Sequence, residues 1–306
     1  MIQLPKEIQI IAEKELNEVP ERVEQDISHI REWLLKQPHI NARTDDYSIL
    51  IYLRACKFSL EKTKNRIELF YTLKYALSYT FESRDPLDPK IQYFFRQNLL
   101  SVLPRTLNEP VLFLFRIENA NADIISIPDG LKMATIIIDA IFQEDKDASV
   151  VGQALLFDLK NISRKFIVQA TPTLVKQFVT CLLQGYPMRM KAIHFINVPK
   201  VLIPLYTIFK SFLSKKLQER VSCDPLNGEN TISQYFPISV LPTECGGTAG
   251  PFADMCEKSR IMVESYRQWF IDDQQYRCIE GKRPVSSTLQ FDLFSIDGSF
   301  RKLEVD

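Results

Sequence analysis

Apolar residues in the first eighty positions recur every three or four residues, which is the spacing of amphipathic helices. After Pro20, the side chains of Val23, Ile27 and Ile30 lie on one helical face. Thr44 is expected to cap a second helix and Ser59 a third. The predicted helices span about 20–34, 45–56 and 59–79. Short amphipathic helices with short connections pack as antiparallel bundles, so the pattern predicts an all-helical N-terminal module.

The pattern changes after the turn-forming segment SRDPLDPK, residues 83–90. Continuous apolar runs, typical of strands buried on both faces, then alternate with helical segments. The predicted strands are 111–117, 154–159 and 192–198, and the predicted helices run from Pro89 to about Leu100, from Gly130 to Phe142, and from Thr171 to about Gln184, where Gly185 would supply a left-handed stop. This alternation predicts an α/β layer with a mostly parallel sheet.

The C-terminal part carries weaker signals. Residues 231–237 are predicted to form a short turn of helix, and 241–250 a glycine-rich loop. One more amphipathic helix is expected from Met255 to about Phe270, and the Asp-Gly pair within 291–305 is typical of a hairpin. The predicted organisation is a helical module over 1–84, an α/β domain over 85–250, and a C-terminal helix and tail over 251–306.

Residues 201–213 form an unusual predicted helix, because large apolar side chains occupy nearly all of its sides. These side chains are Leu202, Leu205, Tyr206, Phe209, Phe212 and Leu213. Such a helix is buried all round, or it covers something apolar that is not its own chain. Two interpretations therefore stay open, an ordinary core helix and a moving lid over an apolar cavity.

Basic residues flank this helix on both sides. Arg189 and Lys191 are two apart on a predicted strand and share a face, and Lys216 and Arg220 are four apart on a predicted helix and share another. Ordinary solvated charge is one interpretation. The alternative is an anionic membrane surface, where each cation contributes about 1 kcal/mol of binding free energy.

The composition narrows the class of protein. The 306 residues are 45% hydrophobic, with 38 basic and 38 acidic side chains, and this zero net charge argues against a general nucleic-acid binder. No window of about 18 uninterrupted apolar residues and no N-terminal signal pattern is evident. The six cysteines form no C-x-x-C pair, which favours reduced thiols in a cytosolic protein, and three scattered histidines make a metal site improbable.

Catalytic signals are weak. The sequence contains neither a G-x-S-x-G elbow nor a G-x-x-x-x-G-K-[ST] loop, and GGTAG at 246–250 lacks dinucleotide spacing. His194 lies inside a predicted strand, where a satisfied core histidine is more common than a general base. Asp139, in the apolar helix, either faces solvent or binds a ligand hydroxyl. We therefore expect no catalytic residues, although an enzyme acting on a lipid, with Asp139 or His194 as base, is a third possibility.

Several collinear motifs resemble a known family. LRACKFSLEKTKNRIELFYTLK resembles the N-terminal helical module of the CRAL-TRIO lipid-binding proteins. LLFDL, QGYPMRMKAIHFINVP, FKSFLSKKLQERV and LPTECGG resemble their lipid-binding domain in order and spacing. The similarity covers roughly residues 30–250. The branch it resembles is that of the α-tocopherol transfer and cellular retinaldehyde-binding proteins, and the tail DLFSIDGSFRKLEVD is similar to tails of insect members.

The resemblance implies a carrier with an α/β cage that is closed by the helix at 201–213 acting as a gate. It implies a phosphoinositide-binding cleft at Arg54, Arg189, Lys191, Lys216 and Arg220. It implies a ligand cavity lined by Thr135, Ile136, Asp139, Phe157, Ile162, Phe178, Cys181, Leu182, Tyr186 and Ile193. Asn161, Arg164, Asp139 and Cys245 depart from the family pattern. The differences at Arg164 and Asp139 leave the ligand open among tocopherols, retinoids, carotenoids, sterols and phospholipids.

The function expected from these observations is that of a non-enzymatic intracellular carrier. It binds a tocopherol- or retinoid-like molecule and exchanges it at phosphoinositide-containing membranes, as a cytoplasmic, reversibly membrane-associated monomer without a cofactor, a metal or a nucleic-acid partner. The alternative is an adaptor, whose helical module binds a protein and whose cavity is vestigial.

Overall fold

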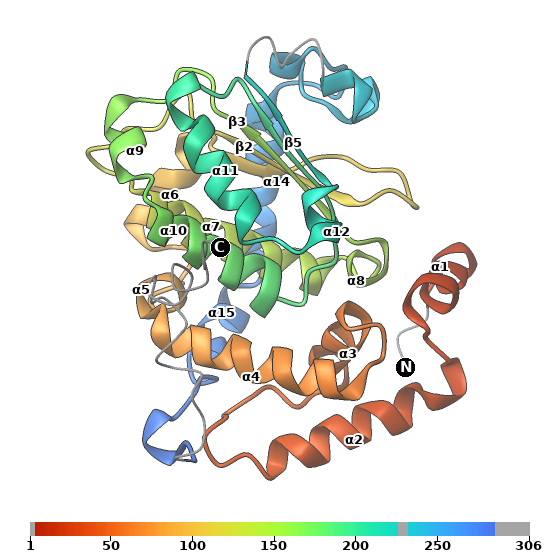
Figure 1. Ribbon diagram of the computed structural model, residues 1–306. Helices are drawn as coiled ribbons and strands as arrows, with labels where there is room; N and C mark the ends of the chain where they lie inside the picture. Colours follow the sequence, from red (N-terminus) through yellow and green to blue (C-terminus); the bar gives the residue numbers. More distant parts are fainter. Residues whose placement is uncertain (1–3, 226–231, 285–306) are drawn as a thin grey trace, which may run out of the picture.

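The computed structural model describes residues 4–225 and 232–284 (Figure 1), and it begins with a helical module. Its helices are α1 (Lys6–Leu16), η1 (Pro20–Arg22), α2 (Val23–Leu35), α3 (Asp46–Ala55), α4 (Leu60–Ala76) and α5 (Ser78–Phe81). The predicted all-helical module is thus confirmed. One detail differs, because the side chain of Asp45, not that of Thr44, caps α3 by accepting a hydrogen bond from the backbone N–H of Ser48.

A five-stranded sheet follows, with its strands in chain order. The strands are β1 (Leu100–Val102), β2 (Val111–Arg116), β3 (Gln153–Asp158), β4 (Met190–Ile196) and β5 (Val221–Asp224). β1 pairs antiparallel with β2, and the remaining pairs are parallel. The mostly parallel sheet is confirmed, but the pattern did not predict the two short edge strands.

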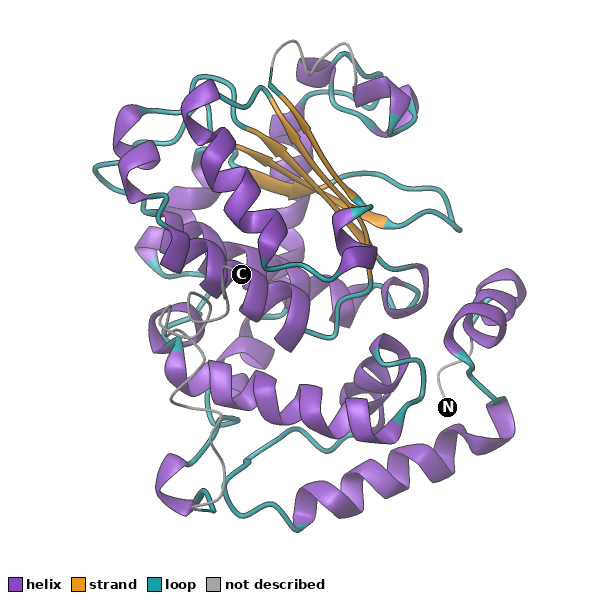
Figure 2. Ribbon diagram, viewed as in Figure 1, coloured by secondary structure: helices purple, strands orange, loops and turns teal. Residues whose placement is uncertain are grey.

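Helices cover the sheet (Figure 2), and several differ in length from the predictions. They are α6 (Pro89–Arg96), α7 (Ile127–Glu144), α8 (Ala148–Val151), α9 (Arg164–Gln169), α10 (Pro172–Phe178), the π-helical turn η2 (Val179–Gly185), η3 (Lys200–Leu202), α11 (Ile203–Ser211) and α12 (Lys215–Gln218). α6 ends early because the chain enters β1. α7 begins earlier than predicted because Ser126 and Asp129 form a capping box at its start.

The prediction for Gly185 is wrong, because this residue does not have a left-handed backbone conformation. The helix after Thr171 instead widens into η2, and glycine is needed there for space. A Cβ atom at Gly185 would lie 2.6 Å from Cδ1 of Leu73 in α4. The small residue thus lets the α/β layer lie against the helical module.

Alternate residues of each strand face opposite sides of the sheet. Phe113 and Leu155 belong to the larger core, beneath α7 and α10, and Leu112 and Leu156 belong to a smaller core on the other face. The smaller core is covered by short 3-10 turns and by α14. The C-terminal elements are η4 (Ile232–Gln234), η5 (Ile238–Val240), η6 (Thr243–Cys245), α14 (Phe252–Ser265), α15 (Arg267–Asp273) and η7 (Glu280–Lys282).

The larger core runs from the helical module into the α/β layer. It contains Ile8 and Leu73 as well as Ile136 and Phe270. Instead of one helix at 255–270, the chain forms α14 and α15 with a break at Tyr266. The predicted hairpin at 291–305 lies outside the described residues. Within the described part of the chain, no helix is both long and apolar enough to cross a membrane.

Candidate functional site: an apolar cavity, a gate helix and a basic cleft

A cavity of about 600 Å³ lies at the carboxyl ends of β2 and β3, where open α/β sheets bind their ligands. Phe115 and Phe157 project from these strand ends, and helices α5, α7, α9 and α10 supply most of the other walls. The apolar lining includes Phe94, Ile117, Ile125, Leu131, Ala134, Ile162, Phe166, Leu174, Phe178, Leu202 and Leu205. An apolar cavity of this size suits a small hydrophobic molecule.

A second apolar cavity of about 180 Å³ lies between α10 and α11. It shares Phe157, Phe178, Leu202 and Leu205 with the larger cavity. The ring of Phe157 stacks between Phe115 and Phe195, with centroids 4.7 Å and 4.9 Å away. The aromatic stack therefore forms a common floor under both cavities.

The predicted gate helix forms a wall of both cavities. Leu202 and Leu205 line the larger cavity, and Tyr206 and Phe209 line the smaller one. Phe212 and Leu213 pack against the larger core instead. Within α11 only Phe209 is buried, so this helix covers the cavities without being enclosed itself. The helix is therefore not an ordinary core helix that is buried on all sides.

The predicted cavity residues divide into two groups. Phe157, Ile162 and Phe178 line the larger cavity. The other seven line neither of the two apolar cavities; they are Thr135, Ile136, Asp139, Cys181, Leu182, Tyr186 and Ile193. Apart from Asp139, these side chains are buried. They lie deeper, toward α4, where aromatic rings and ion pairs fill the space.

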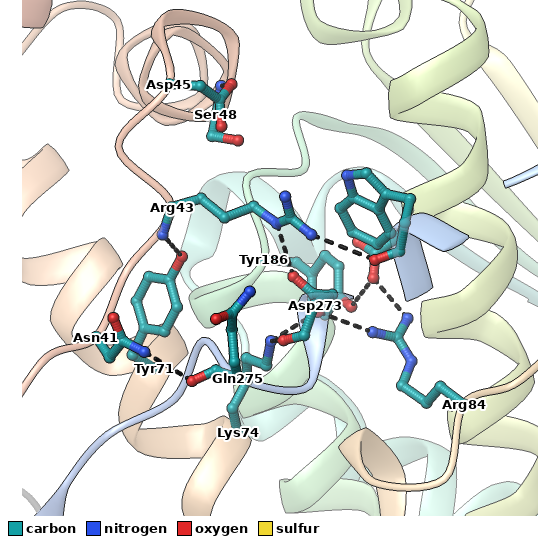
Figure 3. Close-up of polar contacts among 12 residues, drawn as sticks. Asn41, Arg43, Asp45, Ser48, Tyr71, Lys74, Arg84, Tyr186, Asp273 and Gln275 are labelled. Atoms are coloured by element: carbon teal, nitrogen blue, oxygen red, sulfur yellow. Dashed lines mark hydrogen bonds and ion pairs between the residues drawn. The ribbon is translucent and has the colours of Figure 1, made fainter. Parts of the chain in front are cut away.

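The deeper region holds a buried network of ion pairs (Figure 3). Nη2 of Arg84 lies 2.5 Å from Oδ2 of Asp139, and the hydroxyl of Tyr186 donates a hydrogen bond of 3.1 Å to the same oxygen. Asp139 thus lines neither apolar cavity, and its carboxylate, with the side chain 12% exposed, contacts Arg84 and Tyr186. Burial raises the pKa of Asp139 above its usual value, although Arg84 opposes this shift.

Asp273 of α15 joins this network to the helical module. Its carboxylate lies 2.7 Å from Nζ of Lys74, 2.9 Å from Nε of Arg43 and 3.6 Å from Nη1 of Arg84. Burial alone would raise the pKa of Asp273, but Lys74 and Arg84 hold it below its usual value. These ion pairs tie the C-terminal segment to α4 and to the start of the α/β domain.

A basic cleft of about 720 Å³ separates the helical module from α12 and η2. Its cations are Lys57, Lys62, Arg66 and Lys216. Arg66 donates hydrogen bonds to the carbonyl oxygens of Leu183 and Gln184 at the end of η2. Burial, followed by the neighbouring cations Lys216 and Arg189, lowers the pKa of Lys57. The sequence prediction missed the first three cations, although they lie within the motif LRACKFSLEKTKNR.

The five predicted phosphoinositide-binding residues have different surroundings. Arg54 is 1% exposed and is held by Glu18, with Nε···Oε2 and Nη2···Oε1 distances of 2.8 Å and 3.1 Å. Arg189 and Lys191 share the carboxylate of Glu15 at 3.0 Å and 2.7 Å. Lys216 lines the cleft.

Arg220, the fifth of these residues, donates a hydrogen bond to the carbonyl oxygen of Met190 on β4. Of the five side chains, Lys216 lines the cleft, and Arg189 and Lys191 lie near enough to influence the pKa of Lys57, which also lines it. Because its guanidinium is already paired, Arg54 is not presented to an incoming anion.

The candidate catalytic histidine lies away from the cavities. His194 contacts the hydroxyl of Ser222 on β5 and packs against the ring of Tyr235, with centroids 4.1 Å apart. Burial lowers the pKa of His194 below its usual value. In the described ranges 4–225 and 232–284, no group of three His, Cys, Asp or Glu side chains could hold a metal ion.

The fold and the site define a protein with an apolar cavity at the sheet's carboxyl edge, walled by a partly exposed helix. Comparison with known families agrees with this class. The CRAL/TRIO domain model matches residues 96–247, and the model of the Pinta-like UBA domain matches residues 19–91. The chain belongs to the CRAL/TRIO family of lipid-binding proteins.

Similar proteins include the clavesins. Clavesin-2 from Rattus norvegicus is 28% identical over 278 residues, which cover 90% of this chain and 83% of that protein. Clavesin-1 from Xenopus laevis is 31% identical over 258 residues, which cover 81% of this chain and 75% of that protein. The crystal structure of Sfh5 superposes with a TM-score of 0.48 at 12% identity, over 89% of this chain and 100% of that chain.

Proposed function

We propose that this protein is an intracellular lipid-transfer carrier that binds a tocopherol- or retinoid-like molecule and exchanges it at phosphoinositide-containing membranes. The observation that carries the proposal is the apolar cavity of about 600 Å³ with Leu202 and Leu205 as part of its wall. Burying roughly 400 Å² of hydrocarbon stabilises a complex by about 10 kcal/mol at 25 cal/mol per Å². That free energy is gained relative to water, so it would hold the hydrocarbon in the cavity while the carrier is away from a membrane.

The gate role assigned to η3 and α11 is supported by their shallow anchoring. Phe209 is the one buried side chain of α11, whereas Val201 in η3 is 62% exposed. Outward movement would uncover Leu202 and Leu205, which face the cavity. At a membrane these side chains would meet acyl chains instead of water, which lowers the free-energy cost of opening.

The basic cleft supports the phosphoinositide part of the proposal. Lys57, Lys62 and Lys216 line a concave surface between two parts of the chain. Phosphate groups of a lipid headgroup accept charge-assisted hydrogen bonds from such cations. The cleft and the gate are different regions of the molecule, so headgroup recognition and cavity opening would be separate steps.

Among the described residues that line the cavity, no nucleophile, base and orienting group come together, and this is the basis for proposing a carrier and not an enzyme. Within the described residues, the charged and polar atoms that line the larger cavity come from Arg116 and Asp158 and from hydroxyl and amide side chains. Arg116 and Asp158 pair with each other at 3.2 Å. Each of these two charged side chains therefore already has the other as its partner.

Mass spectrometry of the purified protein, first native and then after organic extraction, tests the proposal. A single stoichiometric lipid, released unchanged, is the expected result, and its identity would give the substrate class. A protein that stays empty after incubation with mixed liposomes would overturn the carrier proposal in favour of an adaptor. Turnover of the bound lipid would instead show an enzyme.

A further inference from the structure

A polar pocket of about 460 Å³ adjoins the apolar cavity on the side of α5 and α6. Ser78, Tyr79, Phe94 and Ile125 line both spaces, so one wall of side chains separates them. The remaining lining of the polar pocket is Glu82, Ser83, Asp88, Lys90, Ile91, Asp129, Lys132 and Met133. An apolar cavity beside a charged pocket suits an amphipathic molecule, whose hydrocarbon part would occupy the cavity and whose polar head would occupy the pocket.

The two lysines of this pocket differ in their pairing. Nζ of Lys90 lies 2.8 Å from Oδ1 of Asp129 and 3.0 Å from the hydroxyl of Tyr79, so its charge is compensated. Nζ of Lys132 donates to the backbone carbonyl of Glu82 at 3.0 Å and lies 4.9 Å above the ring of Tyr79. Among the described residues, no carboxylate forms an ion pair with Lys132.

The surroundings of Lys132 favour binding of an anion. This side chain is partly buried on α7, and burial lowers the pKa of its ammonium group. Asp129 and Asp88 act on Lys132 from beyond ion-pair distance and partly offset the effect of burial. A partly desolvated cation with no carboxylate in direct contact gains more from an anionic ligand than an exposed cation does, because the local dielectric constant is lower. The ligand's charge would replace the contacts with water that Lys132 has lost.

The acidic residues of the pocket limit the charge that such a ligand can carry. Glu82, Asp88 and Asp129 line the same space as Lys132. These carboxylates oppose any added negative charge, and the repulsion grows with the charge of the ligand. A singly charged carboxylate in contact with Lys132 is therefore favoured over a doubly charged phosphate monoester. The hydroxyl of Tyr79 is bound to Asp129 and Lys90, but its side chain is 50% exposed and can move aside.

We propose that Lys132 binds the carboxylate of a long-chain monocarboxylic acid whose hydrocarbon occupies the apolar cavity, with Tyr79 at the boundary between head and tail. This inference rests on the proposed carrier function and narrows its ligand class to acidic amphiphiles. It assigns a headgroup site that is distinct from the basic cleft at Lys57 and Lys216.

The test is a titration of the full chain with oleate, methyl oleate and hexadecyl phosphate, below their aggregation concentrations. Wild-type protein is expected to bind oleate most tightly. Lys132→Met keeps the apolar stem of the side chain and should weaken oleate binding about ten- to hundredfold, the range for a lost charge-assisted hydrogen bond. Lys132→Arg should retain most of the affinity, and the exposed Lys258→Met on α14 is the charge-matched control.

Methyl oleate separates this inference from the carrier proposal and also reports on folding. Unchanged methyl oleate binding in Lys132→Met, together with weakened oleate binding, is the expected result. Equal wild-type affinities for oleate and methyl oleate would overturn the headgroup site but leave the carrier proposal standing. Tighter binding of hexadecyl phosphate would also overturn the assignment to a monocarboxylate, and a wild-type protein that binds none of the three probes would contradict both proposals.

Discussion

The carboxylate of Asp139 is held in a buried pair with Arg84, which is 2% exposed. Replacing Asp139 with Asn removes the charge and leaves the guanidinium with its longer contact to Asp273 at 3.6 Å. Breaking a buried ion pair from one side costs about 3–5 kcal/mol of folding free energy, because an uncompensated charge stays buried. We expect Asp139→Asn to lower the free energy of unfolding by an amount near this range, measured by urea denaturation.

The matched variant replaces both partners, Arg84→Met with Asp139→Leu. Apolar residues of similar volume often substitute for a buried pair without loss of stability. The double variant should therefore recover much of the free energy that Asp139→Asn loses. Exposed ion pairs contribute up to about 1 kcal/mol to stability. If the free energy of unfolding of Asp139→Asn lies within that amount of the wild-type value, the pair contributes no more than an exposed pair does, which would contradict the prediction.

Residue-scale contacts of this kind could not be predicted from spacing. Arg54 was predicted as a phosphoinositide ligand, but its partner Glu18 lies 36 positions away in the chain. Arg84 and Asp139 are 55 positions apart, and no local pattern connects them. The family resemblance pointed to Arg54, and Asp139 was noticed as a charge within an apolar helix. Their partners Glu18 and Arg84 could not be identified, because these contacts depend on how distant segments pack together.

At the scale of elements, the surroundings of Gly185 and Gly130 lead us to expect opposite changes in stability when each glycine is replaced by alanine. A Cβ atom at Gly185 meets Leu73 at 2.6 Å, whereas one at Gly130 in α7 meets no atom within 4 Å. Gly185→Ala should destabilise by about 1–3 kcal/mol through overpacking between η2 and α4. Gly130→Ala should stabilise by up to about 1 kcal/mol, because alanine restricts the unfolded chain and favours helix.

Thermal and urea unfolding of these two variants measure the difference. A loss of stability in both variants would show that α7 does not accommodate a methyl group at Gly130, contrary to the open space around this position. No loss in Gly185→Ala would show that the flexible end of Leu73 moves aside without cost. The Gly185 outcome would overturn the packing argument for the junction between η2 and the helical module.

The elements themselves were predicted to different degrees for a physical reason. β2, β3 and β4 are six or seven residues long and apolar on both faces, so their sequence pattern is strong. β1 and β5 have three and four residues at the sheet edges, where pairing with a neighbour decides the conformation more than composition does. The gate helix was predicted from its apolar surface, but which of its residues line a cavity depends on α10 beneath it.

At the scale of the whole molecule, the proposed headgroup site and the apolar cavities lie in different regions. Lys216 lines the basic cleft, whereas neither Lys216 nor Arg220 lines an apolar cavity. Lys216→Ala with Arg220→Ala should weaken binding to phosphoinositide vesicles by roughly 2 kcal/mol, about thirtyfold, at about 1 kcal/mol per cation. Uptake of a hydrophobic ligand in solution should stay unchanged.

Vesicle sedimentation and a solution ligand titration measure the two activities separately. Lys36→Ala with Lys258→Ala removes the same charge from exposed positions elsewhere on the surface and serves as the control. If both double variants lose vesicle binding equally, the loss results from the change in net charge and not from the cleft. Equal loss of vesicle binding and ligand uptake in the cleft variant would contradict the division between the two regions.

Replacing Glu15 of α1 is expected to strengthen vesicle binding instead of weakening it. Its carboxylate pairs with both Arg189 and Lys191, and hydrogen bonding to Lys191 is the main cause that holds the pKa of Glu15 below its usual value. Glu15→Gln would free two cations beside the cleft, so vesicle binding should tighten, by up to about 1 kcal/mol for each cation released. Added salt should reduce this gain, because the residues involved are partly exposed.

The comparison with Glu13→Gln isolates the contribution of this contact. Glu13 lies on the same helix, is exposed and accepts a hydrogen bond from Gln9, so its replacement changes net charge by the same amount. If the two variants bind phosphoinositide vesicles equally, α1 does not restrain the cleft. If Glu15→Gln alone binds more tightly, the helical module regulates membrane association by competing for the cations that a headgroup would use.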